Sequence, residues 1–430
     1  MNMQALVRRL TAGGFARNVA TLASGAALAQ ALPLLFAPLL TRLYSPADFG
    51  LLAVFVAWLS NLAVIATARF DMAVVLPKSD VEAAQLMRLS LLINTVLLLL
   101  CLLLFWPWHD AIATLLQAPA LASWLPLLPL GVWLAGSVAA WTAWNNRQRR
   151  YAANAQGRVA QSLGVSLLQV AAGWSGLAAG GLIVSQLLGQ AIALLALARA
   201  DIAARFASLR GHAPQALRAV ARRYREFPLV NTPHAFVVAF QDSLMLAMLT
   251  ALSGAGIVGQ YALVLRVLKL PAALVGQAVA QVVFRDLAEA AASGRALSGL
   301  LKRALLILAA LSLLPFGVLA AWGGPLFALV FGSAWHGAGQ IAALLAPYFA
   351  AAFIAGPAFM VPMVIGRQRA SFVFVLIGVV VNLAAFAAVY LASRDAMQAF
   401  ALMSAVMTVY FAAYVAWVFR LLGRRELVHA

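Results

Sequence analysis

Charge is scarce in this chain. Only 10% of its 430 residues are charged, whereas 65% are hydrophobic. This balance excludes a soluble globular protein and is typical of a chain that crosses a membrane several times. The formal net charge of +18 could suggest nucleic-acid binding. The basic residues, however, stand in short segments between apolar runs rather than on one polar face, so we expect no nucleic-acid partner.

Cysteine is nearly absent, and so are the motifs that carry enzyme chemistry. The single cysteine, Cys101, lies within an apolar run, which excludes an internal disulfide and a cysteine metal cluster. The five histidines are scattered along the chain. There is no G-x-x-x-x-G-K phosphate loop, no H-E-x-x-H and no G-x-S-x-G. We therefore expect a protein that is not an enzyme and that holds neither a metal nor an organic cofactor.

Long apolar runs fill the chain instead. A helix needs roughly 20 residues to cross a hydrocarbon core about 30 Å thick. The first run is too long for the apolar region of a cleaved signal peptide. The predicted spans are residues 19–41, 49–68, 86–106, 124–144, 159–178, 181–198, 229–251, 257–284, 304–322, 340–365, 370–392 and 397–419. The expected fold class is therefore an all-α polytopic membrane protein with about twelve transmembrane helices.

The positions of the basic residues predict an orientation. Successive segments between the spans must lie on alternate sides of the membrane. The segments on one side hold 26 of the 30 Lys and Arg residues, and those on the other side hold only Arg42 and Arg394. The remaining two, Arg266 and Lys269, lie inside the eighth span. Because cytoplasmic segments carry an excess of Lys and Arg, both termini are predicted to be cytoplasmic.

A weak internal repeat relates the two halves of the chain. Five identities share a constant offset of 209 residues, about half of the chain length. The pairs are Leu40 and Leu249, Thr41 and Thr250, Leu43 and Leu252, Gly50 and Gly259, and Ala53 and Ala262. The offset spans six helices, an even number, so both halves should have the same topology. We predict two pseudo-symmetric six-helix bundles, residues 1–210 and 211–430, around a central cavity.

Three charged residues fall inside the seventh and eighth spans. Asp242 and Arg266 are equally far along the chain from Gly254, so an antiparallel hairpin would place them at about the same depth. Lys269 follows Arg266 by about one helical turn. Charges at membrane depth usually face a bundle interior or a wet cavity. Two cations outnumber one carboxylate, which predicts a site for an anion such as a phosphate.

Uncharged polar residues extend this predicted site. Several of them share a helical face with the three charges, and others could face the same space from the first two spans. The predicted cavity-lining residues are Arg266, Lys269, Asp242, His234, Gln241, Gln277, Gln30 and Asn61. The alternative for each Gln and Asn is a hydrogen bond between neighbouring helices.

Two features near the predicted cytoplasmic surface have two interpretations each. Arg69 and Asp71, at the end of the second span, could form an interfacial ion pair or a gate. Ion pairs close to water contribute little, so the sequence does not decide between them. The arginines of residues 199–228 could form an amphipathic helix on anionic lipid, or they could simply set the orientation of the chain.

Three stretches of the chain resemble a known family. They are residues 39–50, Leu-Leu-Thr-Arg-Leu-Tyr-Ser-Pro-Ala-Asp-Phe-Gly, residues 68–77, Ala-Arg-Phe-Asp-Met-Ala-Val-Val-Leu-Pro, and residues 259–271, Gly-Gln-Tyr-Ala-Leu-Val-Leu-Arg-Val-Leu-Lys-Leu-Pro. They are similar to stretches of the bacterial oligosaccharide flippases, the O-antigen translocase-like polysaccharide biosynthesis proteins. These belong to the multidrug/oligosaccharidyl-lipid/polysaccharide exporter superfamily. The resemblance covers the whole chain in the number, length and order of its spans.

The resemblance implies a substrate and a location. The substrate would be an oligosaccharide linked to a polyprenyl pyrophosphate, moved from the cytoplasmic to the periplasmic leaflet of the bacterial inner membrane. Arg266 and Asp242 would face the cavity, and Arg42 and Arg69 would be motif arginines. Some relatives couple transport to a proton or sodium gradient, so H+ or Na+ is the coupling ion that the resemblance suggests. Partners would include the lipid bilayer and the polysaccharide polymerase and chain-length machinery of lipopolysaccharide O-antigen, capsule or exopolysaccharide assembly.

Three other functions stay open from the sequence. A cation-coupled drug antiporter of the same fold would be expected to carry more acid in its cavity than Asp242 alone. A membrane sugar polymerase or ligase would be expected to have a substantial external loop with acid-base residues, and the predicted external loops are short. A scaffold without transport activity would not need Arg266 and Lys269 inside the membrane.

Overall fold

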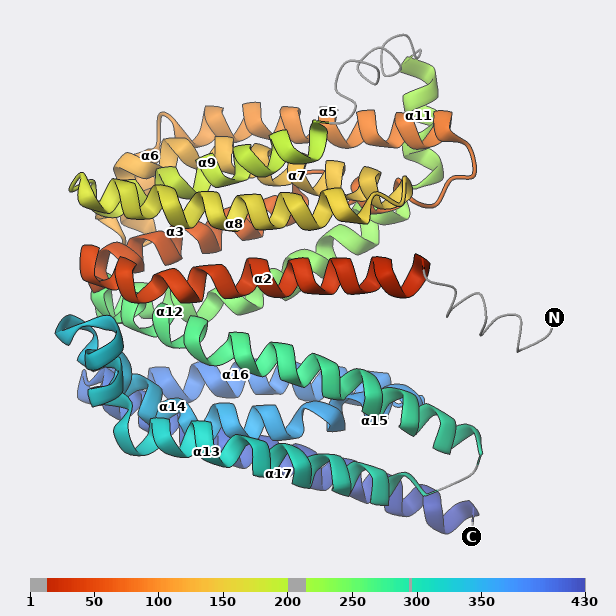
Figure 1. Cartoon of the computed structure of the whole chain (residues 1–430), viewed down its shortest axis with the longest axis vertical. Helices are drawn as coiled ribbons and strands as arrows, with labels where there is room; N and C mark the ends of the chain where they lie inside the picture. Colours follow the sequence, from red (N-terminus) through yellow and green to blue (C-terminus); the bar gives the residue numbers. More distant parts are fainter. Residues whose placement is uncertain (1–13, 200–213, 294–295, 430) are drawn as a thin grey trace. The chain divides into compact units, whose positions relative to one another are not determined.

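The computed structural model describes residues 14–199, 214–293 and 296–429 (Figure 1). All regular structure within these ranges is helical, and no strand is found in them. The first part of the chain forms α2 (Gly14–Leu43), α3 (Pro46–Ile65), α4 (Phe70–Ala73), α5 (Asp80–Phe105), α6 (His109–Leu115), η1 (Pro119–Leu127), α7 (Leu128–Arg147), α8 (Tyr151–Trp174), α9 (Ala178–Ala198), α11 (Pro214–Arg223) and η2 (Phe227–Asn231). The rest forms α12 (Thr232–Ala292), α13 (Leu297–Phe331), η3 (Ser333–Trp335), α14 (His336–Ala355), η4 (Gly356–Met360), α15 (Val361–Val364), α16 (Gln368–Ser393) and α17 (Ala396–His429).

The chain divides into two compact units. The N-terminal unit comprises residues 1–255, and the C-terminal unit comprises residues 256–430. The division follows Gly254, the position at which α12 is interrupted. It is a division by packing, whereas the predicted halves 1–210 and 211–430 are a division by internal repetition. Those halves and their pseudo-symmetry stay a prediction.

The fold class predicted from the apolar runs is confirmed. Ten helical stretches of the described residues are long and apolar enough to cross a membrane. One of the ten, Ser243–Lys269, runs through the interruption of α12 and so includes parts of two predicted spans. The fifth predicted span lies on the 24-residue α8, which is not among the ten. Every predicted span thus falls on a helix, and the protein is a multi-pass all-α membrane protein.

The interruption of α12 supports the internal repeat. Gly254 has φ 79° and ψ 169°, a conformation that favours glycine because a Cβ would be strained there. Subtracting the repeat offset of 209 from 254 gives Ser45, where the chain breaks between α2 and α3. At Ser45 a capping box starts α3: Asp48 N donates to Ser45 Oγ, and Ser45 N donates to the Asp48 carboxylate. The same break is therefore made by different residues in the two places.

The burial of the repeated residues agrees with this relation. Leu40 and Leu249 are both completely buried, and Thr41 and Thr250 are both nearly so. The other three pairs also share their burial: the two glycines are buried, and the paired Leu and Ala residues are half-buried. Each threonine hydroxyl donates to a backbone carbonyl within its own helix. The repeat thus extends from the sequence to the helix break and to the burial of the residues around it.

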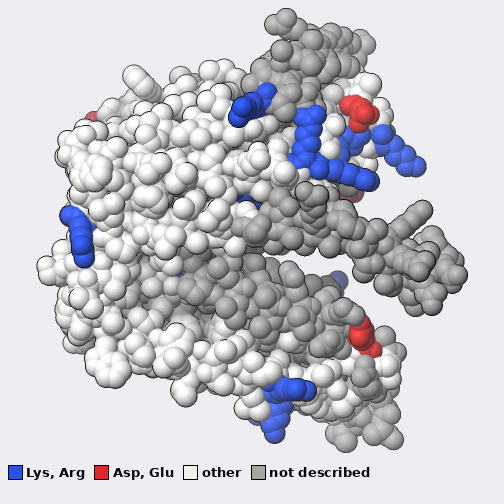
Figure 2. Space-filling model, in the orientation of Figure 1, with Lys and Arg blue, Asp and Glu red and all other residues white. Residues whose placement is uncertain are grey.

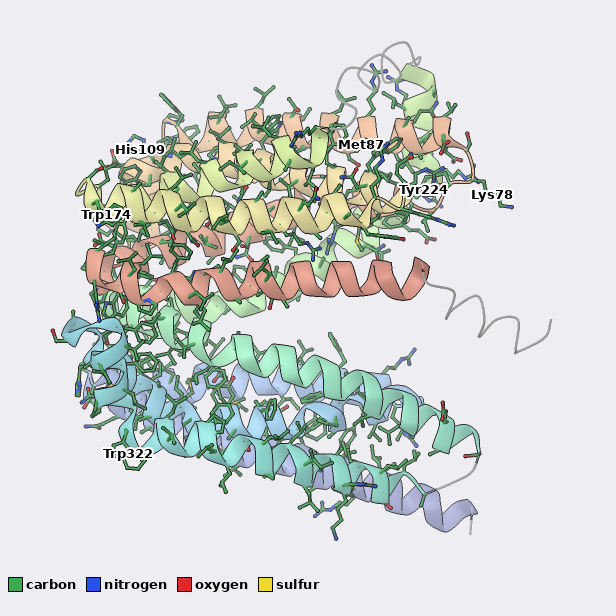
Figure 3. All side chains as sticks on the ribbon, in the orientation of Figure 1. Lys78, Met87, His109, Trp174, Tyr224 and Trp322 are labelled. Atoms are coloured by element: carbon green, nitrogen blue, oxygen red, sulfur yellow. The ribbon has the colours of Figure 1, made fainter. Side chains whose placement is uncertain are left out.

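The N-terminal unit packs its helices around a core that contains polar side chains. Figure 1 shows α5, α7, α8 and α9 running side by side. At one end of the unit lie Lys78 and Tyr224, and at the opposite end lie His109 and Trp174 (Figure 3). A cluster of buried side chains from α4, α5, α7, α9 and α11 fills the first of these ends, which we call the basic end.

The C-terminal unit is packed differently. The neighbouring helices α13 and α14, α14 and α17, and α16 and α17 make its main contacts. A chain of aromatic rings occupies its interior, with Phe359 and Tyr414 stacked at 4.3 Å between ring centroids. α13 and α14 approach so closely at Gly323 and Gly339 that a Cβ on either would collide with the backbone of the other. Such close approach of small residues is a common way to pack membrane helices.

The outer surface suits a hydrocarbon solvent. Many Leu, Val and Ile side chains on the outside of both units are largely exposed, among them Leu103 and Leu313. Figure 2 shows wide uncharged areas over the sides of the helices, with Lys and Arg gathered near helix ends. Exposed apolar area on this scale is incompatible with water and is satisfied by lipid.

Candidate functional site

The predicted cations lie on the part of α12 that follows Gly254. Arg266 is half-buried between the buried residues Val264 and Leu268, and Lys269 is exposed. No ion pair joins either residue to another residue that the structure describes. An arginine at this position in a membrane helix is costly unless it faces water or an anion. The part played by Arg266 and Lys269 in binding stays a prediction.

The other predicted cavity residues are distributed over several helices. Gln30 is exposed on α2, and Asn61 is buried on α3 with no hydrogen-bond partner for its Oδ1. Arg42 is exposed in the last turn of α2. The side chains predicted to join them from α12 lie outside the described residues: His234, Gln241, Asp242 and Gln277. The assembly of these residues into one site stays a prediction.

The segment that joins α3 to α5 has a strained backbone. Ala68 and Arg69 have φ values of 46° and 60°, the left-handed region that side chains other than glycine, Asn and Asp rarely occupy. Each such residue costs of order 1–2 kcal/mol, and such strain persists where surrounding contacts fix the chain. Asp71, only 7% exposed, accepts a hydrogen bond of 2.5 Å from Thr67 Oγ1. No ion pair joins Asp71 to Arg69, so their interpretation as an ion pair is wrong.

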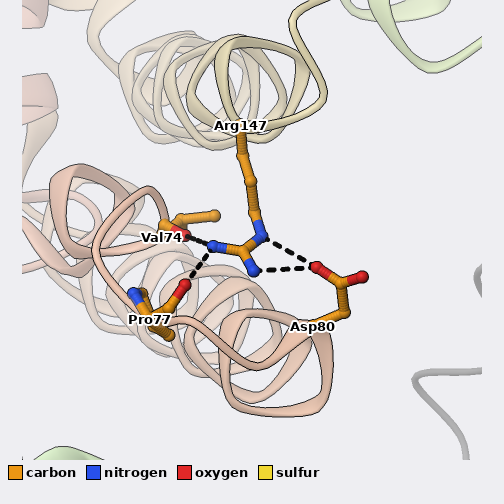
Figure 4. Close-up of polar contacts among 4 residues, drawn as sticks. All are labelled: Val74, Pro77, Asp80 and Arg147. Atoms are coloured by element: carbon orange, nitrogen blue, oxygen red, sulfur yellow. Dashed lines mark hydrogen bonds and ion pairs between the residues drawn. The ribbon is translucent and has the colours of Figure 1, made fainter.

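Arg147, at the end of α7, holds this segment in place (Figure 4). Its Nη1 donates to the carbonyl oxygens of Val74 and Pro77 at 3.3 and 2.6 Å. Its Nε and Nη2 donate to Asp80 Oδ1 at 3.2 and 2.8 Å. The Arg147 side chain is only 11% exposed, whereas that of Asp80 is 82% exposed. The two carbonyl bonds therefore contribute more than the ion pair, which is screened by water.

A cavity of about 630 Å³ lies behind the segment, wholly within the N-terminal unit. Its walls come from residues 69–75, which include α4, and from α7, α8 and α9. Small residues of α7 and α9, chiefly alanines, make its apolar side. Its polar side carries two arginines, one carboxylate and four uncharged polar groups: Arg69, Arg158, Asp71, Thr142, Asn146, Asn154 and Gln161. Predicted motif residues Arg69 and Asp71 thus share a cavity with residues of α8.

Two buried polar atoms beside this cavity have no partner. Asn154 Nδ2 donates to the Thr142 carbonyl oxygen at 3.1 Å and to Asn146 Oδ1 at 2.8 Å, but its own Oδ1 accepts no hydrogen bond. Arg69 Nε is buried and likewise has no partner. Buried polar groups are nearly always hydrogen-bonded, so unpaired ones indicate a place for water, an ion or a ligand.

A basic helix covers the same end of the unit. Val220 of α11 is buried in the core cluster at the basic end. Arg223 forms an ion pair of 2.9 Å with Glu82, and the Tyr224 hydroxyl donates to the same carboxylate at 3.3 Å. Burial, followed by the negative charge of Glu82, raises the pKa of Tyr224. Residues 214–223 thus form a helix, as one of the two interpretations of these arginines requires, and Val220 on it contacts protein, whereas contact with anionic lipid stays a prediction.

Sequence reasoning missed several of these residues. Arg158, Asn154 and Gln161 lie near the start of α8, a helix that was noted only as a span beginning at residue 159. Arg147 was counted only for its charge, because the carbonyl oxygens that it contacts are about 70 residues away in the chain. The polar residues at every third or fourth position of α8 were the available signal, since such spacing places them on one helical face.

Comparison with known proteins identifies the family. Residues 39–340 match the family of polysaccharide biosynthesis proteins. This chain belongs to that family. The resemblance seen in the three sequence stretches is thereby confirmed. No curated protein is significantly similar to the chain.

Solved structures give the fold of this family member. The chain is similar to the lipid II flippase MurJ in an inward closed conformation, with a TM-score of 0.72, 13% identity and coverage of 95% of this chain and 90% of that one. It is similar to an inward-facing multidrug resistance MATE family transporter of the MOP superfamily, with a TM-score of 0.61, 15% identity and coverage of 95% and 96%. A MOP superfamily transporter from Pyrococcus furiosus gives a TM-score of 0.52 at 12% identity, with 96% of both chains covered. The protein therefore has the fold of MOP superfamily transporters.

Proposed function

We propose that this protein is a flippase that moves a polyprenyl-pyrophosphate-linked oligosaccharide from the cytoplasmic to the periplasmic leaflet of the bacterial inner membrane. One observation carries the proposal: a member of a polysaccharide biosynthesis family has, over nearly its whole length, the fold of membrane transporters. Polysaccharide assembly supplies the substrate class, and the fold supplies transport. A lipid-linked saccharide intermediate that must cross the membrane satisfies both.

The chemistry of Arg266 supports this substrate. A pyrophosphate carries negative charge through the membrane, and an arginine binds such a group through a planar fork of N–H donors. Lys269, one turn further along α12, adds a second positive charge. The oligosaccharide would bind the uncharged polar residues, and the polyprenyl tail would stay in lipid. Alternating access, in which two halves rock around one site, would then carry the headgroup across.

Asp242 is proposed to couple transport to an ion gradient. In this mechanism Asp242 pairs with Arg266 while the site is empty. Arriving pyrophosphate competes for Arg266 and frees the carboxylate to take up a proton or a sodium ion. The alternative is a permanent pair with a structural role. Asp242→Asn decides between them: coupling predicts slow transport that no longer responds to an imposed ion gradient, and a permanent pair predicts that the response is kept.

Transport of a defined probe tests the proposed function. The purified protein is reconstituted into vesicles that contain a fluorescent polyprenyl-pyrophosphate-linked oligosaccharide, and the fraction reached by an external quencher is followed. We expect faster exchange between leaflets than in protein-free vesicles. A fluorescent cationic drug in matched vesicles tests the antiporter that similarity to a MATE transporter favours, and lengthening of the saccharide tests the polymerase. Drug transport or sugar polymerisation without lipid exchange would contradict the proposal.

The proposed orientation and partners follow from the same function. Both termini are proposed to lie in the cytoplasm, because 26 of the 30 Lys and Arg residues fall in one of the two alternating sets of segments between the spans. The flipped product would serve the polymerase and chain-length machinery of surface polysaccharide assembly. Cysteine residues introduced at Lys78 and at Ala111 of a Cys101→Ser chain test the orientation. Labelling of the Lys78 site by an impermeant reagent in intact cells would contradict it.

A further inference from the structure

We propose that the cavity at the basic end of the N-terminal unit binds a phosphate group, held between Arg69 and Arg158. All residues that line this cavity belong to the N-terminal unit, and neither Arg266 nor Lys269 is among them. The inference concerns binding alone and does not require that the protein be a flippase.

The charge of the cavity indicates an anion. Two guanidinium groups, those of Arg69 and Arg158, meet one carboxylate, that of Asp71. The Asp71 carboxylate is already hydrogen-bonded by Thr67 and forms no ion pair with either arginine. The cavity therefore retains an excess of positive charge. Arginine pairs are the usual partners of phosphate groups, which offer oxygen acceptors in matching geometry.

An unpaired donor points to the same conclusion. Arg69 Nε is buried without a hydrogen-bond partner, although burying an unpaired polar group is costly. A phosphate oxygen would supply the missing acceptor. The amide groups of Asn146 and Gln161 line the same cavity and offer further N–H donors to a ligand.

The strained backbone at Arg69 also supports a binding role. Ala68 and Arg69 are consecutive residues in the left-handed region, and Arg147 fixes the chain that follows them. Strained backbone of this kind is concentrated at binding and switch sites, where it aims a side chain that a relaxed chain would place elsewhere. Here the strained residue carries one of the two arginines that face the cavity.

The size and lining of the cavity fit an amphiphilic phosphate. Its 630 Å³ falls within the range of about 300–1,000 Å³ that ligand pockets occupy. Alanines of α7 and Leu197 of α9 form an apolar wall next to the polar side. Two sources share this chemistry: the headgroup of an anionic membrane lipid, and a pyrophosphate such as that of a lipid-linked sugar.

Binding measurements on the purified full-length chain in neutral detergent test the site. Calorimetry measures the binding of inorganic pyrophosphate. Native mass spectrometry compares the binding of phosphatidylglycerol with that of phosphatidylcholine. Both are applied to the Arg69→Gln, Arg158→Gln and Arg222→Gln variants. Arg158 and Arg222 are exposed, so both changes should preserve folding, and Arg222 of α11 lies outside the cavity. We expect at least one of the two anions to bind at least tenfold more weakly to Arg69→Gln and Arg158→Gln, with Arg222→Gln unchanged.

The pattern of loss identifies the source. Loss of pyrophosphate binding alone indicates a pyrophosphate ligand, and loss of phosphatidylglycerol alone indicates a membrane lipid. Arg69→Lys should recover part of the binding, because it keeps the charge but not the planar fork. Equal binding of both anions by Arg158→Gln, Arg222→Gln and the unmodified protein would overturn the site, whatever the transport assay shows.

Discussion

The interiors of the two compact units contain different types of side chain. Among the residues that the structure describes, fourteen of sixteen buried polar or charged side chains belong to the N-terminal unit. The C-terminal unit contributes only Ser312 and Ser404 to that set, and its interior holds stacked aromatic rings instead. The N-terminal unit also contains the cavity between α4, α7, α8 and α9.

This difference predicts that the two units are destabilised by different kinds of substitution. Hydrogen bonds are directional, so a polar interior is sensitive to the loss of single donors. A ring-filled interior depends on shape, so it is sensitive to added volume. We therefore expect the N-terminal unit to be weakened by removing polar groups and the C-terminal unit by enlarging small residues.

The largest expected effect is that of Gly339→Leu in the C-terminal unit. A Cβ at Gly339 would lie 2.1 Å from the Gly323 carbonyl oxygen, which cannot move aside as a flexible side chain could. Overpacking against backbone should lower the free energy of unfolding by about 3 kcal/mol or more. Thermal unfolding in detergent measures it. Gly317→Leu on α13, where a Cβ meets open space, is the control, and equal stability of the two variants would show that the close approach is not limiting.

Arg147→Ala should have the largest polar effect in the N-terminal unit. The change removes two bonds to the carbonyl oxygens of Val74 and Pro77. Hydrogen bonds from a charged donor contribute about 1.5–3 kcal/mol each, so we expect a loss of about 3 kcal/mol. Proteolysis of residues 66–79 should also become faster, which limited digestion with mass spectrometry would detect. Unchanged protection of that segment would contradict the role given to Arg147.

Two buried asparagines provide a more subtle comparison. Asn94 Nδ2 donates to the Trp133 carbonyl oxygen and to Ser137 Oγ, whereas no hydrogen bond is found for Asn61. Asn94→Leu should cost about 1–2 kcal/mol, and Asn61→Leu should be nearly neutral because it removes an unsatisfied group. Denaturation of both variants tests the difference. If Asn61→Leu is neutral for stability but lowers transport, the predicted role of Asn61 in the cavity is supported. Equal destabilisation by both would refute the contrast.

Asp80→Asn should have the smallest effect. The carboxylate is 82% exposed, and an ion pair so close to water contributes about 0.5 kcal/mol or less. Comparison with Arg147→Ala separates the ion pair from the carbonyl bonds at one side chain. A loss for Asp80→Asn as large as that for Arg147→Ala would mean that the charge pair, and not the carbonyl contacts, holds the segment.

The helical fold was predictable because bilayer thickness sets helix length. Each apolar run of the required length falls on a helix, and the short loop around Gly254 is the interruption of α12. A serine followed three residues later by an acid, as at Ser45 and Asp48, favours a helix start, although the second span was predicted to begin only at residue 49. The fifth span, on α8, is less apolar than the others because α8 carries polar residues that line a cavity.

The candidate sites were predictable only in part. Arg69 and Asp71 stood out as charges at a helix end, but an ion pair was only one interpretation and it is wrong: Thr67 bonds the carboxylate. The left-handed backbone at Ala68 and Arg69 left no signal, because neither residue type favours it. The bonds of Arg147 go to main-chain oxygens, which every residue has. Sequence therefore indicates which side chains are charged but not which distant carbonyls they meet.

The proposed flippase activity depends most directly on Arg266, so its substitution is the decisive measurement. Vesicles with a fluorescent polyprenyl-pyrophosphate-linked oligosaccharide are prepared with Arg266→Ala, Arg266→Lys and Arg303→Ala, the last being an exposed arginine of α13. The proposal predicts that Arg266→Ala falls to the rate of protein-free vesicles, that Arg266→Lys recovers part of the rate because the charge remains, and that Arg303→Ala keeps it. An Arg266→Ala protein that is correctly inserted and exchanges the lipid as fast as the unmodified chain would contradict it.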